Sequence, residues 1–138
     1  MITQALTASF KKELLQGVHD FDTDTFKIAL YTNSSNISSS TIEYTAVNEV
    51  VGSGYTAGGA TLTNIGVALS GTTAYTSWED YTWSNSTLTT AGALIYNASK
   101  SNRSVAVLNF GGDYSTDAAD FTVTFPPNTS TTAVVIIY

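Results

Sequence analysis

The sequence contains no cysteine, one histidine and two prolines among its 138 residues. Without cysteine, the chain has no disulfide framework and no thiolate that could act as a nucleophile or a metal ligand. Because His19 is the sole histidine, a zinc site would have to depend mostly on carboxylates. We interpret His19 as a helix-capping or solvent-facing residue, and we predict no metal site.

Positive charge is also scarce. Lysine and arginine together number five, against eleven aspartates and glutamates, which gives a formal net charge of −6 at pH 7. Binding to nucleic acid or to an anionic membrane normally relies on clustered lysine and arginine. The basic residues of this chain are scattered along the sequence: Lys11, Lys12, Lys27, Lys100 and Arg103. We therefore predict no nucleic-acid partner and no membrane partner.

Long hydrophobic runs are absent as well. The longest purely apolar run extends from Ala133 to Tyr138, whereas a membrane-spanning helix needs roughly 20 residues. The first residues lack the apolar centre of a signal peptide. We expect neither a membrane segment nor a signal peptide, and the length of the chain predicts a single domain over residues 1–138.

The N-terminal residues have a helical period. Apolar residues recur at every fourth position, at Ile2, Leu6, Phe10, Leu14 and Val18. This spacing predicts one amphipathic helix over residues 1–19, with Thr3 as a possible N-cap and Gly17 near its end. The apolar stripe either covers one face of a following sheet or docks on a neighbouring subunit.

After residue 25 the pattern becomes that of β-strands. Short β-prone segments are separated by turn residues, and Gly111-Gly112-Asp113 is expected to end one of them. The segments are Phe26–Tyr31, Thr41–Val51, Ala60–Leu69 with a break, Ala74–Trp83, Leu88–Tyr96, Ser104–Phe110, Phe121–Phe125 and Ala133–Tyr138. Seven or eight short strands predict a mainly β fold, an antiparallel β-sandwich or jelly-roll-like domain over residues 26–138.

A possible calcium motif is incomplete. Asp20, Asp22 and Asp24 alternate as in the opening of a calcium-binding loop. Thr25 stands where that loop needs glycine, and Tyr31 stands where it needs a bidentate glutamate. We interpret the three aspartates as a polar connector between the helix and the first long strand.

No pattern in the sequence predicts catalysis. His19 lies in no recognisable serine or cysteine motif, and the glycine clusters at 52–59 and 111–112 lack the phosphate-binding patterns. Carboxylates that could pair for sugar hydrolysis occur at Glu43, Glu49, Glu79 and Asp80, but the sequence places no two of them at a required distance. We predict a protein without enzymatic activity and without a cofactor.

Aromatic residues gather in one region of the sequence. Tyr55, Tyr75, Trp78, Tyr81 and Trp83 could form a stacking platform for sugar rings, or they could fill the core and an interface. We favour the second interpretation. Together with the apolar stripe of the helix, it predicts these interface residues: Leu6, Phe10, Leu14, Tyr75, Trp78, Tyr81 and Trp83.

Several stretches in a fixed order resemble a known group of proteins. They are Gln4–Gly17, Asp24–Thr32, Tyr44–Gly59, Ala93–Asn97, Arg103–Gly111 and Phe121–Pro126. Over nearly the whole chain, they resemble small structural proteins of tailed bacteriophages, including cyanophages. The resemblance implies a part of the virion, and it supplies no catalytic or ligand-binding residues.

From this resemblance we expect a capsid decoration, or cement, protein on the surface of the phage particle, made in the host cytoplasm. Its partners would be the major capsid protein or other virion proteins, and it would form a homo-oligomer, a trimer or a dimer, to match the symmetry of a shell. The first alternative is a neck, tail, baseplate or fibre-attachment protein. A further alternative is a carbohydrate-binding module for contact with the host surface.

Overall fold

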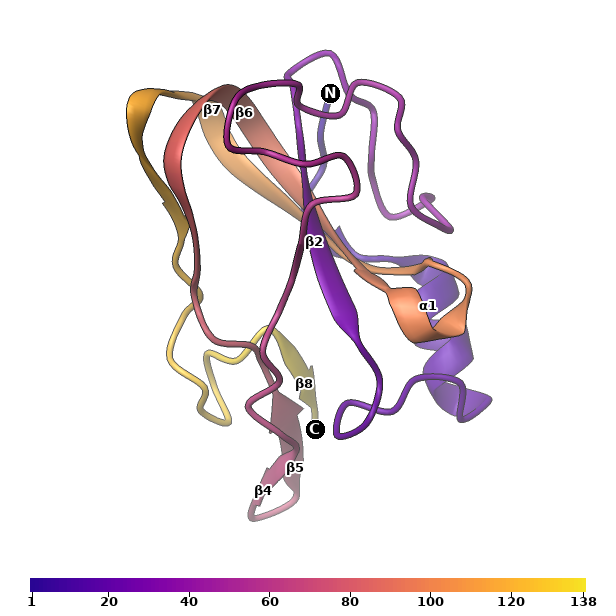
Figure 1. The fold of residues 1–138 in the computed structure, drawn as a ribbon. Coiled ribbons are helices and arrows are strands. Elements are labelled where there is room, and N and C mark those ends of the chain that lie inside the picture. Colours follow the sequence, from indigo (N-terminus) through magenta and orange to yellow (C-terminus); the bar gives the residue numbers. More distant parts are fainter.

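The computed structural model describes residues 1–138 and is mainly β, as predicted (Figure 1). Its eight strands all pair antiparallel. The elements in chain order are β1 (Ala5–Leu6), α1 (Ala8–Leu15), β2 (Phe26–Tyr31), β3 (Ala60–Thr61), β4 (Ala68–Ser70), β5 (Thr73–Thr76), β6 (Tyr81–Asn97), the 3-10 helix η1 (Ala98–Lys100), β7 (Arg103–Val123) and β8 (Val135–Ile137).

The strands form two sheets. The larger sheet has the order β1-β7-β6-β2-β3, and the smaller one has the order β4-β5-β8. Figure 1 shows the small sheet below the large one, with its β4–β5 hairpin projecting from that end of the molecule. The two antiparallel sheets and the single short helix agree with the predicted sandwich-like fold. No helix is both long and apolar enough to cross a membrane.

The N-terminal helix is shorter than the predicted range of residues 1–19. It spans Ala8–Leu15, and Ala5 and Leu6 instead pair as a strand with β7. Thr7, and not Thr3, is the N-cap, and its side-chain oxygen accepts a hydrogen bond from the backbone N–H of Phe10 at 3.4 Å. The apolar residues at every fourth position predicted a helix from the first residues onward. They give no sign that the backbone groups of β7 pair with Ala5 and Leu6, so this pairing is visible only in the structure.

Two of the strands are far longer than predicted. β7 includes both Ser104–Phe110 and most of Phe121–Phe125, so Gly111-Gly112-Asp113 does not end a strand. The register instead slips there, because Thr90 pairs with Tyr114 while Gly92 pairs with Asn109. A bulge of this kind bends a strand without ending it. By contrast, the segment Thr41–Val51 forms only isolated bridges.

The bend folds β7 back on itself. The rings of Phe110 and Phe121, both in β7, have centroids 6.0 Å apart, although a straight strand would separate them by about 36 Å. Figure 1 shows the β6–β7 ribbon arching over the molecule. The concave side of this curl contributes residues from both halves of β7 to a surface groove.

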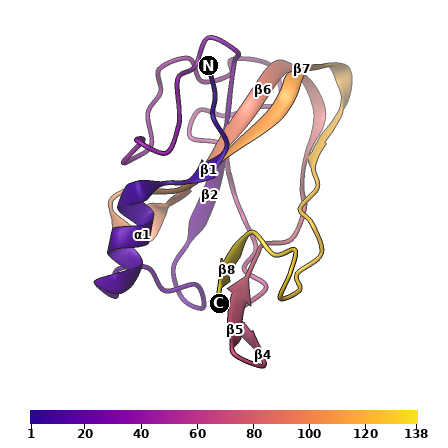
Figure 2. The ribbon, with the colours of Figure 1, turned by 180° about the vertical axis from the view of Figure 1, so that it is seen from behind.

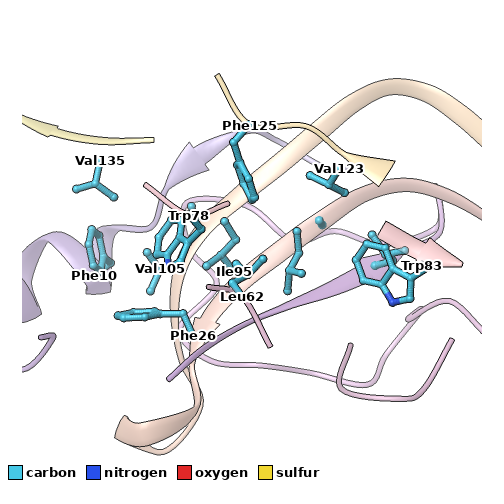
Figure 3. Close-up of a cluster of buried hydrophobic side chains, with 14 of the residues drawn as sticks. Phe10, Phe26, Leu62, Trp78, Trp83, Ile95, Val105, Val123, Phe125 and Val135 are labelled. Atoms are coloured by element: carbon cyan, nitrogen blue, oxygen red, sulfur yellow. The ribbon is translucent and has the colours of Figure 1, made fainter. Parts of the chain in front are cut away.

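The main core lies between the two sheets and α1 (Figure 3). Phe10 from α1, Phe26 from β2 and Trp78 are almost fully buried in it, and Trp83 lies at the far end of the same cluster. The Nε1 atom of Trp78 donates a hydrogen bond to Asn64 Oδ1 at 3.0 Å. A smaller cluster lies on the other face of the large sheet and includes Ile2, Tyr31 and Leu94.

Candidate interaction surfaces

Three of the seven predicted interface residues lie in the core of the chain itself. Phe10, Trp78 and Trp83 are 0%, 1% and 4% exposed to solvent. They are therefore not available for contacts with a partner, and that part of the prediction is wrong. Apolar periodicity marks residues that will be covered, but it does not say whether the same chain or another one covers them.

A buried polar cluster joins the start of the chain to the turn between β6 and β7. His19 Nε2 lies 2.9 Å from Glu13 Oε1, and His19 Nδ1 lies 3.0 Å from Asn97 Nδ2. Asn97 also donates to Asp24 Oδ2 at 2.8 Å. The side chain of His19 is completely buried, which corrects the capping or solvent-facing role expected from the sequence.

The carboxylates of this cluster are stabilised in their charged form. Burial by itself raises the pKa of Glu13, but hydrogen bonds from His19 and Arg103 outweigh burial and lower the pKa below its ordinary value. Burial likewise raises the pKa of Asp24, and bonds from Asn97, the backbone of Asp20 and Lys100 lower it overall. The cluster thus holds the chain together through paired charges.

The aspartates of the D-x-D-x-D motif are engaged within the connector. Asp20 Oδ1 accepts hydrogen bonds from the backbone N–H groups of Asp22 and Thr23, at 2.9 and 3.3 Å. Asp22 Oδ1 accepts one from Val67 at 3.3 Å. These bonds fit the predicted role of a polar connector between α1 and β2.

A second buried cluster centres on Glu49, which is 8% exposed and makes no salt bridge. Its carboxylate accepts hydrogen bonds from Tyr44 Oη at 2.5 Å, from Tyr55 Oη at 2.7 Å and from the Gly58 N–H at 2.7 Å. Tyr96 Oη donates to the Gly58 carbonyl at 2.6 Å. No known sequence motif marks this cluster, and its one signal in the sequence is that Tyr44 and Tyr55 lie on either side of Glu49 in a polar loop.

The tyrosines of this region have raised pKa values. Burial is the largest cause for Tyr44 and Tyr55, and the hydrogen bond that each makes to Glu49 adds to it. Burial, followed by the charge of Glu49, raises the pKa of Tyr96 to about 12. Tyr55 is therefore held against Glu49 by its hydrogen bond and is not part of an open stacking platform.

The largest hollow in the surface is an apolar groove of about 670 Å³. One side of it carries Leu6 of β1, and the other carries residues from the second half of β7 and from the segment that follows. Its apolar lining includes Leu108, Phe110 and Phe121, which also pack against the main core. Leu6 is thus a predicted interface residue that does lie on a surface hollow.

A second apolar surface lies at the tip of the small sheet, and we call it the end patch: Leu14, Val67, Leu69, Ala74, Tyr75 and Ile137. Leu69, Ala74 and Ile137 are paired across β4, β5 and β8, so they form one row on the same face. Leu69 is 73% exposed, and Val67 and Ile137 are 52% exposed. Leu14 and Tyr75 line a small apolar hollow beside this row.

Tyr81, the last predicted interface residue, is half-buried. Its ring packs edge-on against Trp83 with centroids 4.7 Å apart. The predicted set is therefore divided: the groove has Leu6, the end patch has Leu14 and Tyr75, and Tyr81 lies apart from both surfaces.

Comparison with known proteins gave no match to a family model, a curated protein or a solved structure.

Proposed function

We propose that this chain is a structural component of a bacteriophage virion, a capsid decoration protein that acts by protein–protein contacts. The observation that carries the proposal is the end patch. It places a row of apolar side chains from three strands on the surface, in a protein whose largest buried polar clusters are satisfied internally. Contiguous exposed apolar surface of this kind marks a site of contact with another protein.

The small sheet is suited to this role. Its inner face begins in the core, where Val135 is 4% exposed, and continues outward to Ile137, which is 52% exposed. The buried residue Val135 therefore anchors the strand, while Ile137 on the same face remains exposed to solvent. A neighbouring virion protein that covers Leu69 and Ile137 would gain about 25 cal/mol for each Å² of apolar area removed from water.

Repetition makes modest contacts sufficient. On a capsid, many copies would bind in parallel, so each interface can be moderate while the shell as a whole is stabilised. A symmetric homo-oligomer, a trimer or a dimer, would match the symmetry axes of the shell. The major capsid protein or another virion protein would be the partner.

Electron cryomicroscopy of the intact phage particle tests the proposal. We expect density for this chain repeated over the capsid lattice, with the end patch against a neighbouring subunit. Density confined to the neck, tail or baseplate would replace the decoration role with another virion role. Absence of the chain from purified particles, checked by quantitative mass spectrometry, would overturn the proposal as a whole.

A pair of variants connects the patch to attachment. Leu69→Asn removes an exposed apolar side chain from the row, and Val51→Asn makes the same kind of change at a residue that is 95% exposed and outside the patch. We expect the Leu69 variant to bind weakly to particles that lack this protein and the Val51 variant to bind normally. Equal binding by both variants would remove the end patch from the proposal.

The carbohydrate-binding alternative has no support from a specific feature of the structure. Trp78 and Trp83, the two largest rings that a stacking platform would use, are buried.

A further inference from the structure

Strand β7 has one paired edge and one largely open edge. Along its length it pairs with β6, whereas the other edge is covered only near its start. The partners there are Ile42 at Ser104, Thr7 at Val105, and β1 at Ala106 and Val107. Two positions further on, the backbone N–H of Asn109 donates a hydrogen bond to Gln4 Oε1 at 3.0 Å. Beyond that point, no strand lies against this edge.

The alternation of the backbone identifies the groups that face outward. The N–H of Phe125 donates to Asp80 at 2.8 Å, on the side of β6. Because N–H and C=O groups alternate between the two edges of a strand, those of Thr122 and Thr124 point to the open edge. Directly after β1, the N–H of Thr7 bonds the Val105 carbonyl of β7, so the backbone groups of Leu6 point away from β7.

These two sets of free backbone groups lie on opposite sides of the 670 Å³ groove. Leu6, Thr122 and Thr124 all line it, as do the apolar side chains of Phe110 and Phe121. No charged residue is among the lining residues. Figure 2 shows β1 on one side and the second half of β7, with the segment after it, on the other.

We propose that this groove binds an extended segment of a partner protein, which adds as a strand between β1 and the second half of β7. Its backbone would bond the free groups of Leu6 on one side and of Thr122 and Thr124 on the other. Its alternate side chains would be apolar and would pack on Phe110 and Phe121. One added strand in this position closes the curled sheet towards a barrel and removes two open edges.

The charge of the whole chain bears on the chemistry of the segment. The lining of the groove carries no charge, and the nearby carboxylates of Asp80 and Asp120 accept hydrogen bonds from the backbone N–H groups of Phe125 and Asn85, on the side of β6. Because the chain has a net charge of −6, a segment with lysine or arginine next to its apolar part would be favoured over an acidic one. This inference stands independently of the end patch and of the virion role.

The experiment uses the full chain and a synthetic peptide of alternating valine and threonine with a lysine at each end. We expect the peptide to shift the NMR amide signals of Leu6, Thr122 and Thr124 and to slow the hydrogen exchange of those amides. The same peptide with methylated backbone nitrogens keeps its side chains but cannot donate hydrogen bonds. We expect the methylated peptide to bind about five- to tenfold more weakly for each hydrogen bond to the protein that methylation removes.

A backbone variant gives the matching test on the protein. Thr124→Pro removes an outward N–H, and Thr124→Ala keeps it; we expect the proline variant alone to lose peptide affinity. Equal affinity for the methylated and unmethylated peptides would overturn the proposal, because side chains alone would then explain binding. Protection of the same amides without peptide, together with dimer formation, would assign the groove to a second copy instead. Binding of a small apolar dye without binding of the peptide would make it a small-molecule pocket.

Discussion

The Nε2 atom of His19 lies 2.9 Å from Oε1 of Glu13, and both side chains are buried. The contact fixes the end of α1 to the connector that leads into β2. Through Asn97 it also reaches the turn of the β6–β7 hairpin. Groups far apart in the sequence thus share one hydrogen-bonded cluster, and the loss of one member should weaken the whole domain.

Replacing Glu13 by alanine tests this cluster. The change leaves the His19 Nε2–H buried without a partner and removes the ion pair with Arg103. We expect the free energy of unfolding in urea to fall by about 2 kcal/mol. Glu79→Ala is the control, because Glu79 is exposed and forms no salt bridge. Equal stability of the two variants would contradict the role given to the cluster.

Acid should destabilise the protein through the same carboxylates. The pKa values of Glu13 and Asp24 are lowered in the folded chain by their hydrogen bonds and charged partners, against the effect of burial. Their contribution to stability is therefore complete above the unfolded-state pKa of about 4 and is lost as the pH falls through the lower folded values.

Urea midpoints measured between neutral pH and pH of about 3 give the readout for acid. We expect the midpoint to fall below pH of about 4, and Asp24→Asn to reduce the slope because one of the shifted groups is gone. A midpoint that stays constant over this range would show that the carboxylates are not linked to folding.

Alkaline pH should act on the Glu49 cluster. Burial and Glu49 raise the pKa of Tyr44, Tyr55 and Tyr96 in the folded chain. The stability from these neutral tyrosines is present below the unfolded-state pKa of about 10 and is lost as the pH rises through the folded values. The protein should therefore weaken above pH of about 10, and Tyr96 should titrate at about 12.

Phenolate absorbance of the protein, which has eight tyrosines, should show a late-ionising group formed by the tyrosines around Glu49. Glu49→Gln removes the negative charge beside the late group, so we expect its titration to move to lower pH. Glu79→Gln should change nothing. A single titration of all tyrosines in the folded protein would contradict the buried cluster.

Gly59 is needed for the close approach of the 50s loop to β2. Its φ is +79°, and a Cβ atom there would overlap the carbonyl oxygen of Ile28. Gly17 has a similar φ of +68° but open space around it. We expect Gly59→Ala to lower the free energy of unfolding by about 2 kcal/mol or more, and Gly17→Ala by about 1 kcal/mol from backbone strain alone. Equal losses of stability by the two variants in thermal unfolding would show that the overlap with Ile28 does not destabilise the protein.

The local patterns predicted the fold class well. The alternating apolar residues of Phe26–Tyr31 form β2, and the expected break in Ala60–Leu69 separates β3 from β4. The helix at the start and the strand at the end are also present. These features depend on residues close together in sequence, where side-chain spacing decides which face is buried.

The candidate surfaces were only partly predictable. Leu6, Leu14 and Tyr75 lie on the two apolar surfaces, but Phe10, Trp78 and Trp83 do not. An aromatic residue has the same local pattern in a core and at an interface, because both places cover apolar area. The groove itself could not be predicted, since it depends on the bend that brings Phe110 to Phe121.

The sequence by itself determined the mainly β character, the presence of a helix near the N-terminus and the acidic balance of charge, because each follows from composition or short-range spacing. The tertiary structure alone decided that β6 and β7 are two long, curled strands and that Glu13, His19 and Asn97 meet. It also decided that β7 keeps an open edge beside an apolar groove. The physical reason is that strand pairing and burial depend on which distant segments become neighbours, and no local pattern records that choice.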